Sequence, residues 1–229
     1  MNTLDYHYKI KNSTDVIFQF PYKNYHPYCH FGDMIAILNM HLYFNNTLNL
    51  NGKLSIENLN DDEMYLAKLF FEENITKESP TYIINLFGSE RENIDMLYEI
   101  YKNNYIKIKN LDMVEKKQYI SYAYDGYSWL NKKIPSFFKD GIDKLKEKYV
   151  NYEFIEIGIN IGLERTIQYI KESKNVITID NGISHLCRCM NTPFIIIKKQ
   201  GWDETKGFPK NHCTYSCYDS YNDMINISL

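Results

Sequence analysis

The stretch Val176-Ile177-Thr178-Ile179-Asp180-Asn181-Gly182-Ile183-Ser184-His185-Leu186 decides the fold of this chain. An apolar, β-branched strand ends at Asp180, and a helix begins almost at once near Gly182. A strand that turns directly into a helix is the repeating element of parallel α/β proteins. The stretch therefore predicts a parallel sheet with its helices packed on the faces.

The turn in this stretch also has the chemistry of an anion site. Asp180 and Ser184 can accept hydrogen bonds from exposed backbone N–H groups, and Gly182 lets another molecule approach the backbone closely. The N–H groups at the start of the helix suit a diphosphate, and His185 can donate to a phosphate oxygen. The alternative is an ordinary strand-to-helix turn with His185 in the core.

The rest of the chain repeats this alternation of strands and helices. The expected strands are 15–20, 47–50, 81–87, 105–108, 119–124, 152–157, 175–179 and 194–197. The expected helices begin at Gly32-Asp33 and at Pro135, and cover 61–73, 94–102, 163–171 and 182–190. Two runs of the alternation predict an α/β protein of two Rossmann-like lobes with parallel sheets, 1–115 and 116–229.

Ligands of open α/β sheets bind beyond the carboxyl ends of the strands. This rule selects five loops: Tyr22–Asp33, Asp125–Pro135, Gly158–Leu163, Asp180–Ser184 and Lys198–Gly207. They are rich in Gly, Asp, Ser and Lys, so a site built from them is expected.

The net charge and the apolar pattern narrow the classes of function. The chain has 229 residues and a formal net charge of −3, so no global basic field attracts DNA or a membrane. The lysines between Asn131 and Tyr149 could form a local basic patch, although a solvated helix face is the preferred interpretation. No apolar run reaches the roughly 18–20 residues of a membrane helix, and the first residues lack a signal-peptide layout, so a cytoplasmic protein is expected.

The five cysteines raise the question of a metal site. Cys187 and Cys189 are followed by Cys213 and Cys217, with His212 beside the second pair. Zinc ligands are usually two to four residues apart, and Cys187 and Cys189 are closer than that on an expected helix. Buried, inert thiols are the preferred interpretation, and no metal is expected.

Asp180, Gly182, His185 and Leu186 resemble the D-[ST]-G-x-x-H-L motif of bacterial heptosyltransferase-type glycosyltransferases, which have the two-lobed GT-B fold. The resemblance implies a reduced GT-B-like fold in which this loop holds the diphosphate of a sugar donor. Asn181 stands where that family has Ser or Thr and keeps a polar side chain there.

Three further segments resemble the same family. In Tyr127–Pro135, Lys132 stands three residues before a helix-starting proline, as does the family's phosphate-contacting lysine, and Ser128 lies near its hydroxyl position. Asn160–Glu164, with Ile161 and Gly162, is similar to the segment whose backbone meets the donor base. Phe31–Ile35 resembles the G-D-[VI] turn, which implies Gly32 in the site and Asp33 as the general base.

The resemblance implies a glycosyltransferase that moves a sugar from a nucleotide-sugar donor to an acceptor hydroxyl, without a metal or other cofactor. The acceptor would be a saccharide, a glycolipid or a modified nucleic acid. The chain is shorter than a typical member, and the family's ribose-binding carboxylate has no matching position, Glu156 and Glu164 lying nearest. The alternatives are a nucleotide-sugar epimerase or hydrolase, or a nucleotide-binding module without catalysis.

Overall fold

The computed structural model describes residues 15–21, 31–81, 106–108, 114–124, 137–179, 181–198, 216–217 and 221–229. The chain divides into two compact units. Unit 1 comprises Met1–Cys29 and Asp33–Ile108, and unit 2 comprises His30–Gly32 and Lys109–Leu229. Apart from His30–Gly32, the division falls between Ile108 and Lys109, and the expected lobes 1–115 and 116–229 stay a prediction.

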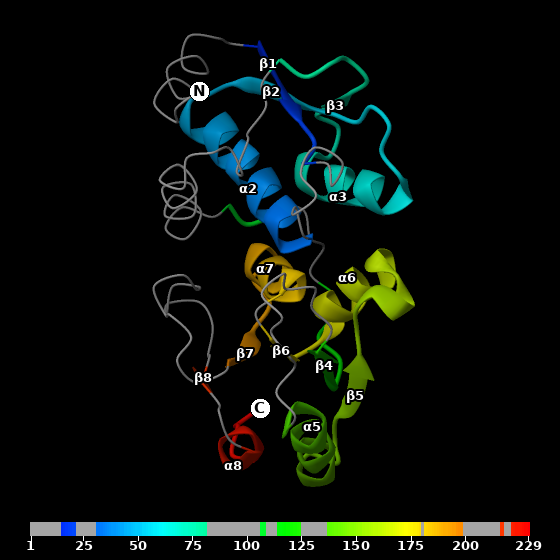
Figure 1. Cartoon of the computed structure of the whole chain (residues 1–229), viewed down its shortest axis with the longest axis vertical. Helices are drawn as coiled ribbons and strands as arrows, with labels where there is room; N and C mark the ends of the chain where they lie inside the picture. The colour runs from blue at the N-terminus through cyan, green and yellow to red at the C-terminus, as the bar shows by residue number, and fades with distance from the viewer. Residues whose placement is uncertain are drawn as a thin grey trace. The chain divides into compact units, whose positions relative to one another are not determined.

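The described part of unit 1 is a small parallel sheet with helices (Figure 1). Strands β1 (Asp15–Gln19), β2 (Asn51–Ser55) and β3 (Ile75–Thr76) lie in that order, and each pairs in parallel with the next. Helix α2 (Phe31–Thr47) connects β1 to β2, and α3 (Asp61–Phe71) connects β2 to β3. These are two βαβ units, as the alternating pattern predicts.

Phe18 of β1 is the centre of the core of unit 1. Its side chain is fully buried, and its ring stacks on His41 of α2 at 4.5 Å between centroids and lies 6.2 Å from the ring of Phe71 of α3. One aromatic side chain of the sheet thus contacts both helices. The apolar positions of β1, α2 and α3 in the sequence are therefore those that face one shared core.

His41 is a fully buried histidine in an apolar environment. Its Nε2 lies 3.1 Å from the backbone carbonyl of Gln19, which can only accept, so Nε2 carries the proton. Its Nδ1 has no hydrogen-bond partner among the described residues. Burial lowers the pKa of His41 to about 3, while the bond to Gln19 acts in the opposite direction.

Acid is therefore expected to destabilise unit 1 through His41. The folded pKa lies below the unfolded value, so the neutral ring stabilises the fold above about pH 6.5, and this contribution is lost as the pH falls towards 3. Between pH 7.5 and 4.5 the loss is about 3 kcal/mol. Urea unfolding at both pH values measures it. His41→Gln keeps an N–H donor but cannot titrate, so equal pH dependence in wild type and variant would contradict the assignment.

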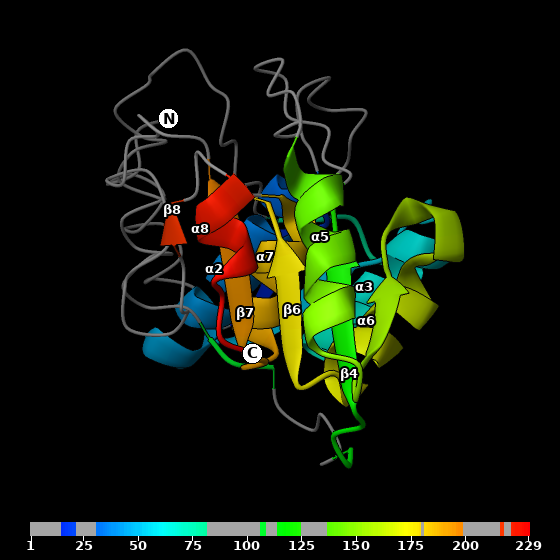
Figure 2. The ribbon, with the colours of Figure 1, turned by 90° about the horizontal axis from the view of Figure 1, so that it is seen from below.

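The described part of unit 2 is a larger sheet in the order β5-β4-β6-β7-β8, with every neighbouring pair parallel. The strands are β4 (Tyr119–Ala123), β5 (Glu153–Glu156), β6 (Asn175–Thr178), β7 (Phe194–Lys198) and β8 (Ser216–Cys217). The helices are α5 (Phe137–Lys148), α6 (Leu163–Glu172), α7 (Gly182–Cys189) and α8 (Tyr221–Ile225), with a 3-10 turn, η1, at Ile159–Ile161. Figure 2 shows α5 and α8 side by side on one face of this sheet.

The sheet of unit 2 has helices on both faces. Ile120 and Ile177 of the sheet pack with Phe138 of α5 and Met224 of α8 in one buried cluster. The opposite face contacts α6 and α7, and there the hydroxyl of Ser121 is hydrogen-bonded to that of Ser173 at 2.7 Å. A strand that is buried on both faces has an unbroken run of apolar residues in its sequence. Residues 194–197 form such a run, and all four are fully buried.

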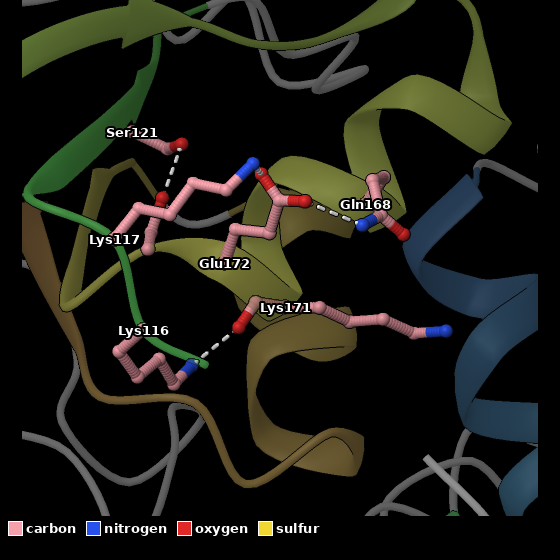
Figure 3. Close-up of polar contacts among 7 residues, drawn as sticks. Lys116, Lys117, Ser121, Gln168, Lys171 and Glu172 are labelled. Atoms are coloured by element: carbon pink, nitrogen blue, oxygen red, sulfur yellow. Dashed lines mark hydrogen bonds and ion pairs between the residues drawn. The ribbon is translucent and has the colours of Figure 1, made fainter. Parts of the chain in front are cut away.

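The start of β4 is attached to the end of α6 by polar contacts (Figure 3). Lys117 forms an ion pair with the mostly buried Glu172 at 2.7 Å, and Gln168 donates to the other oxygen of Glu172 at 2.6 Å. Lys116 donates to the backbone carbonyl of Lys171 at 2.8 Å. The hydrogen bond from Lys117 and the bond from Gln168 lower the pKa of Glu172. These contacts lie at the amino end of β4, away from the loops expected to bind a ligand.

The prediction of an α/β fold with two Rossmann-like lobes and parallel sheets is confirmed. The expected strand 47–50 is wrong: α2 continues to Thr47, and the strand is Asn51–Ser55. A glycine normally weakens a strand. In β2, however, the N–H of Gly52 donates to the side-chain oxygen of Asn45 at 2.8 Å. Asn45 and Phe18 leave no space for a Cβ atom at this position.

The expected strand 105–108 is also wrong in its described part, 106–108. The backbone of Ile106 bonds a side chain instead: Asn39 accepts from its N–H at 2.9 Å and donates to its carbonyl at 2.6 Å. The expected elements 81–87 and 94–102 lie outside the described residues, except for Thr81, whose N–H bonds the carbonyl of Ile17 at 2.9 Å.

Candidate functional site

The turn before α7 is closed by its own side chains. Asn181 is the N-cap, and its side-chain oxygen accepts from the N–H groups of Ile183 at 3.0 Å and Ser184 at 3.3 Å. The Ser184 hydroxyl donates to the Asn181 carbonyl at 2.6 Å, and Thr178 donates to the Asn181 oxygen at 3.0 Å. This is a capping box, which fixes the start of the helix.

The capping box occupies backbone N–H groups that were expected to bind an anion. Ser184 does participate in the cap, as predicted, but the capping oxygen at Ile183 and Ser184 belongs to Asn181, and Asp180 lies outside the described residues. Two of the first N–H groups of α7 are therefore already hydrogen-bonded. The N–H of Gly182 makes no hydrogen bond within the described part of the chain, and the helix dipole remains to attract an anion.

Phe31 and Gly32, the residues of α2 that group with unit 2, pack against the first turn of α7. A Cβ atom added at Gly32 would lie 3.0 Å from Cδ2 and 3.3 Å from Nε2 of His185. A Cβ atom added at Gly182 would lie 3.0 Å from Cγ and Cε1 of Phe31, and closer still to Cδ1. The structure thus brings together three residues expected in the site, namely Gly32, Gly182 and His185.

Phe31 belongs to this contact, although its place in the sequence predicts no role for it. Its side chain is half-buried, and its ring covers Gly182. Nothing in the local pattern pairs an aromatic residue at 31 with a glycine at 182, because the two positions are far apart in the chain. The signal is only the aromatic residue standing directly before the glycine of the G-D turn.

His185 is neutral at pH 7. Burial and the nearby Arg188 guanidinium, one helical turn further along α7, lower the pKa of His185. Arg188 is itself buried, with 3% of its surface exposed. A neutral imidazole can still donate one hydrogen bond to an anion, and the anion-binding role expected of His185 stays a prediction.

The loop after β5 has two glycines that are required by the backbone conformation rather than by close packing. Gly158 has φ 144° and Gly162 has φ 82°, in the region that favours glycine, and a Cβ at either position would meet nothing within 4 Å. Thr166 of α6 fixes the loop, since its hydroxyl donates to the Gly158 carbonyl at 3.0 Å and accepts from the Gly158 N–H at 3.2 Å. These bonds hold the start of the loop against α6, and open space lies beside Gly162.

The other expected site residues are described in part or not at all. Ser128 and Lys132 lie outside the described residues, and so does Asp180. For Asp33 the backbone is described, as the third residue of α2, but not the side chain. The structure therefore leaves the roles of these four residues as predictions.

The lysines of α5 are mostly partnered. Lys144 pairs with Glu147 at 2.6 Å and Lys146 with Asp143 at 3.2 Å, both within the helix. Lys148 donates to the backbone carbonyl of Ile225 at 3.2 Å. These contacts agree with the preferred interpretation of a solvated helix face rather than a nucleic-acid-binding patch.

Comparisons with known proteins bear on the fold. No family model matches the sequence, and no curated protein does. Among solved structures, the crystal structure of the bacterial iron-containing dodecameric glycosyltransferase TibC from enterotoxigenic E. coli H10407 matches with a TM-score of 0.61 at 12% sequence identity. The match covers 91% of this chain and 65% of that one, so the chain spans less than two thirds of the length of TibC.

The expectation that no metal or other cofactor is involved is contradicted by this comparison, because TibC is iron-containing. The described residues nevertheless do not fit a metal site, since no group of three or more His, Cys, Asp or Glu among them could hold an ion. Cys187 and Cys189 are buried in α7, and burial raises the pKa of Cys187. Cys213 and His212 lie outside the described residues.

No helix in the described part of the chain combines the length and apolar character needed to span a bilayer.

Proposed function

We propose that this protein is a glycosyltransferase of the heptosyltransferase type, which moves a sugar from a nucleotide-sugar donor to an acceptor hydroxyl. The single observation that carries the proposal is the packing of Gly32 against His185. Gly32 belongs to the segment that resembles the family's G-D-[VI] turn, and His185 belongs to the segment that resembles its diphosphate-binding loop. The fold shared with TibC supports the same reaction class.

The proposal assigns a role to each part of the site. The donor diphosphate binds at the N-terminus of α7, where Gly182 N–H, His185 and the helix dipole meet it, and Lys132 and Ser128 contact it from the loop before α5. The donor base lies against the backbone of Ile161 and Gly162. Asp33 removes the proton of the acceptor hydroxyl as that oxygen attacks the anomeric carbon.

The leaving group is the nucleoside diphosphate, which departs with the electron pair of the bond to the anomeric carbon. Lys132 and the turn from Asp180 to His185 stabilise its developing charge. Burial and Arg188 lower the pKa of His185, so the part assigned to it is a hydrogen bond to the diphosphate. The acceptor is a saccharide, a glycolipid or a modified nucleic acid.

Thermal unfolding with a panel of nucleotides and nucleotide-sugars tests the proposal. A ligand at about 100 times its Kd is expected to add about 2.7 kcal/mol of stability, seen as a raised Tm. The nucleotide-sugar that raises the Tm is then incubated with saccharide and glycolipid acceptors, and the glycosylated product is measured by mass spectrometry.

The outcomes separate the alternatives. Product formed from the donor alone would indicate an epimerase or a hydrolase, and binding without any turnover would indicate a nucleotide-binding module. If no nucleotide or nucleotide-sugar changes the Tm, a nucleotide-sugar site is absent and the proposal is wrong.

A further inference from the structure

Thr178 carries a buried hydroxyl group at the point where the middle strand of the unit 2 sheet ends. It is the last residue of β6 and pairs with Ala123 of β4 on one side and with Ile196 of β7 on the other. None of its surface is exposed. Valine has nearly the same shape and would avoid the cost of burying a hydroxyl group, so the polar contacts of this hydroxyl are what distinguishes threonine here.

The hydroxyl of Thr178 bonds the turn that leads into α7. It donates to the side-chain oxygen of Asn181 at 3.0 Å, and it shares its single hydrogen with the backbone carbonyl of Ile179 at 3.1 Å. Asn181 is the N-cap of α7. The hydroxyl therefore links the end of the middle strand to the residue that starts the helix.

Three donors surround the side-chain oxygen of Asn181. Besides Thr178, the N–H groups of Ile183 and Ser184 donate to it, at 3.0 Å and 3.3 Å. Because a backbone N–H can only donate, the branch of the amide that faces these groups is the oxygen, and the Thr178 hydroxyl donates to the same atom. Of the three donors only Thr178 belongs to the sheet, so it fixes the cap relative to β6.

The cap determines where the first N–H groups of α7 point. The Ser184 hydroxyl donates to the Asn181 carbonyl at 2.6 Å, which closes the turn on its other side. Gly182 lies inside this closed turn, and its N–H makes no hydrogen bond within the described part of the chain. The direction of the Gly182 N–H thus depends on Asn181, and through Asn181 on Thr178. This direction affects binding, because a hydrogen bond weakens steeply when it is poorly aligned.

We propose that Thr178 is a positioning residue for the diphosphate of the sugar donor: its buried hydroxyl holds Asn181, and thereby the N–H of Gly182, in the orientation that binds phosphate oxygens. This inference rests on the proposed function and adds to it a residue that lies before the donor-binding turn. Thr178 is fully buried and therefore touches no part of the donor itself. Every residue that the inference uses belongs to unit 2.

Thr178→Val in the full chain tests the inference, because it removes the hydroxyl and keeps the shape of the side chain. The probes are UDP, ADP, GDP and CDP together with their nucleosides, and NMR titration gives each Kd, including the weak ones. For the nucleoside diphosphate that binds the wild type, the Kd is expected to rise about 5- to 10-fold, the effect of about one hydrogen bond. The Kd of the matching nucleoside, which has no phosphate, is expected to be unchanged.

Thr178→Ser and Thr192→Val are the matched variants. Thr178→Ser keeps the hydroxyl and is expected to restore the wild-type Kd, while Thr178→Ala removes the hydroxyl by a second route and is expected to act like Thr178→Val. Thr192 is buried near the other end of α7, and its hydroxyl donates to the carbonyl of Ile170 at 3.4 Å. Thr192→Val is expected to leave the Kd of the nucleoside diphosphate unchanged. The Tm of every variant records any loss of stability separately from the loss of binding.

The inference is overturned if Thr178→Val binds the nucleoside diphosphate as tightly as the wild type, if it weakens the nucleoside to the same degree, or if Thr178→Ser does not restore the Kd. Each of these outcomes leaves the proposed function standing, because the wild type binds the nucleoside diphosphate in all of them. If the wild type binds none of the nucleotides, the proposed function itself fails, and the positioning role fails with it.

Discussion

Replacing Asp33 with asparagine is expected to lower the kcat of glycosyl transfer by about 100- to 10,000-fold while the donor still binds. Asparagine has nearly the same shape as aspartate, but its amide cannot take the proton of the acceptor hydroxyl. The acceptor oxygen would then attack the anomeric carbon without a general base. The measurements are kcat at saturating donor and acceptor, and the Tm shift produced by the donor nucleotide.

Asp62→Asn is the matched control for Asp33→Asn. Asp62 is an exposed carboxylate in the first turn of α3, so the same charge is removed from the start of another helix of unit 1. Both variants lose a favourable interaction with a helix dipole, which is a small effect on stability. Wild-type turnover in Asp33→Asn would show that another group takes the proton.

Phe138→Ala is expected to lower the free energy of unfolding by about 3–5 kcal/mol. Phe138 is fully buried in α5, within the cluster that α5 and α8 form with the sheet of unit 2, and its ring lies 6.1 Å from that of Tyr124. Removing the ring leaves a cavity that the surrounding sheet cannot fill, so both the transfer free energy and the packing are lost.

Urea unfolding followed by circular dichroism measures this effect, with Val150→Ala as the control. Val150 follows α5, and 79% of its surface is exposed, so its truncation is expected to change the stability by less than about 0.5 kcal/mol. An equal loss in both variants would mean that the α5–α8 cluster contributes no more than exposed surface. Because the chain has two units, peptide-resolved hydrogen exchange would assign the lost protection to unit 2.

The sequence predicts the large elements of this fold well, because their apolar spacing is set by the burial pattern. Residues 194–197 of β7 are all apolar and fully buried, and α3 begins at the expected Asp61 behind a capping box formed by Asn60 and Glu63. The short elements β3, β8, η1 and α8 are not predicted. Each is only two to five residues long, so pairing and packing with distant elements decide it, and no local periodicity exists to detect.

The candidate site, like the fold, has features that the sequence predicts and features that only the folded structure shows. The turn from Asn181 to His185 can be recognised from its residues, since a strand-to-helix turn with a polar cap is a local feature. That the capping oxygen belongs to Asn181, and that it occupies the N–H groups of Ile183 and Ser184, follows only from the folded geometry. The neutrality of His185 likewise depends on burial and on Arg188.

The sequence by itself determines that this protein is a parallel α/β chain with its candidate ligand-binding turns after the strands, because strand and helix periodicity are local properties. The tertiary structure alone decides that Gly32 and Gly182, which look alike as turn glycines, are packing positions against His185 and Phe31. It also decides that Gly158 and Gly162 are conformational glycines with open space beside them. The physical reason is that space around a residue is defined by neighbours distant in the chain, and these exist only after folding.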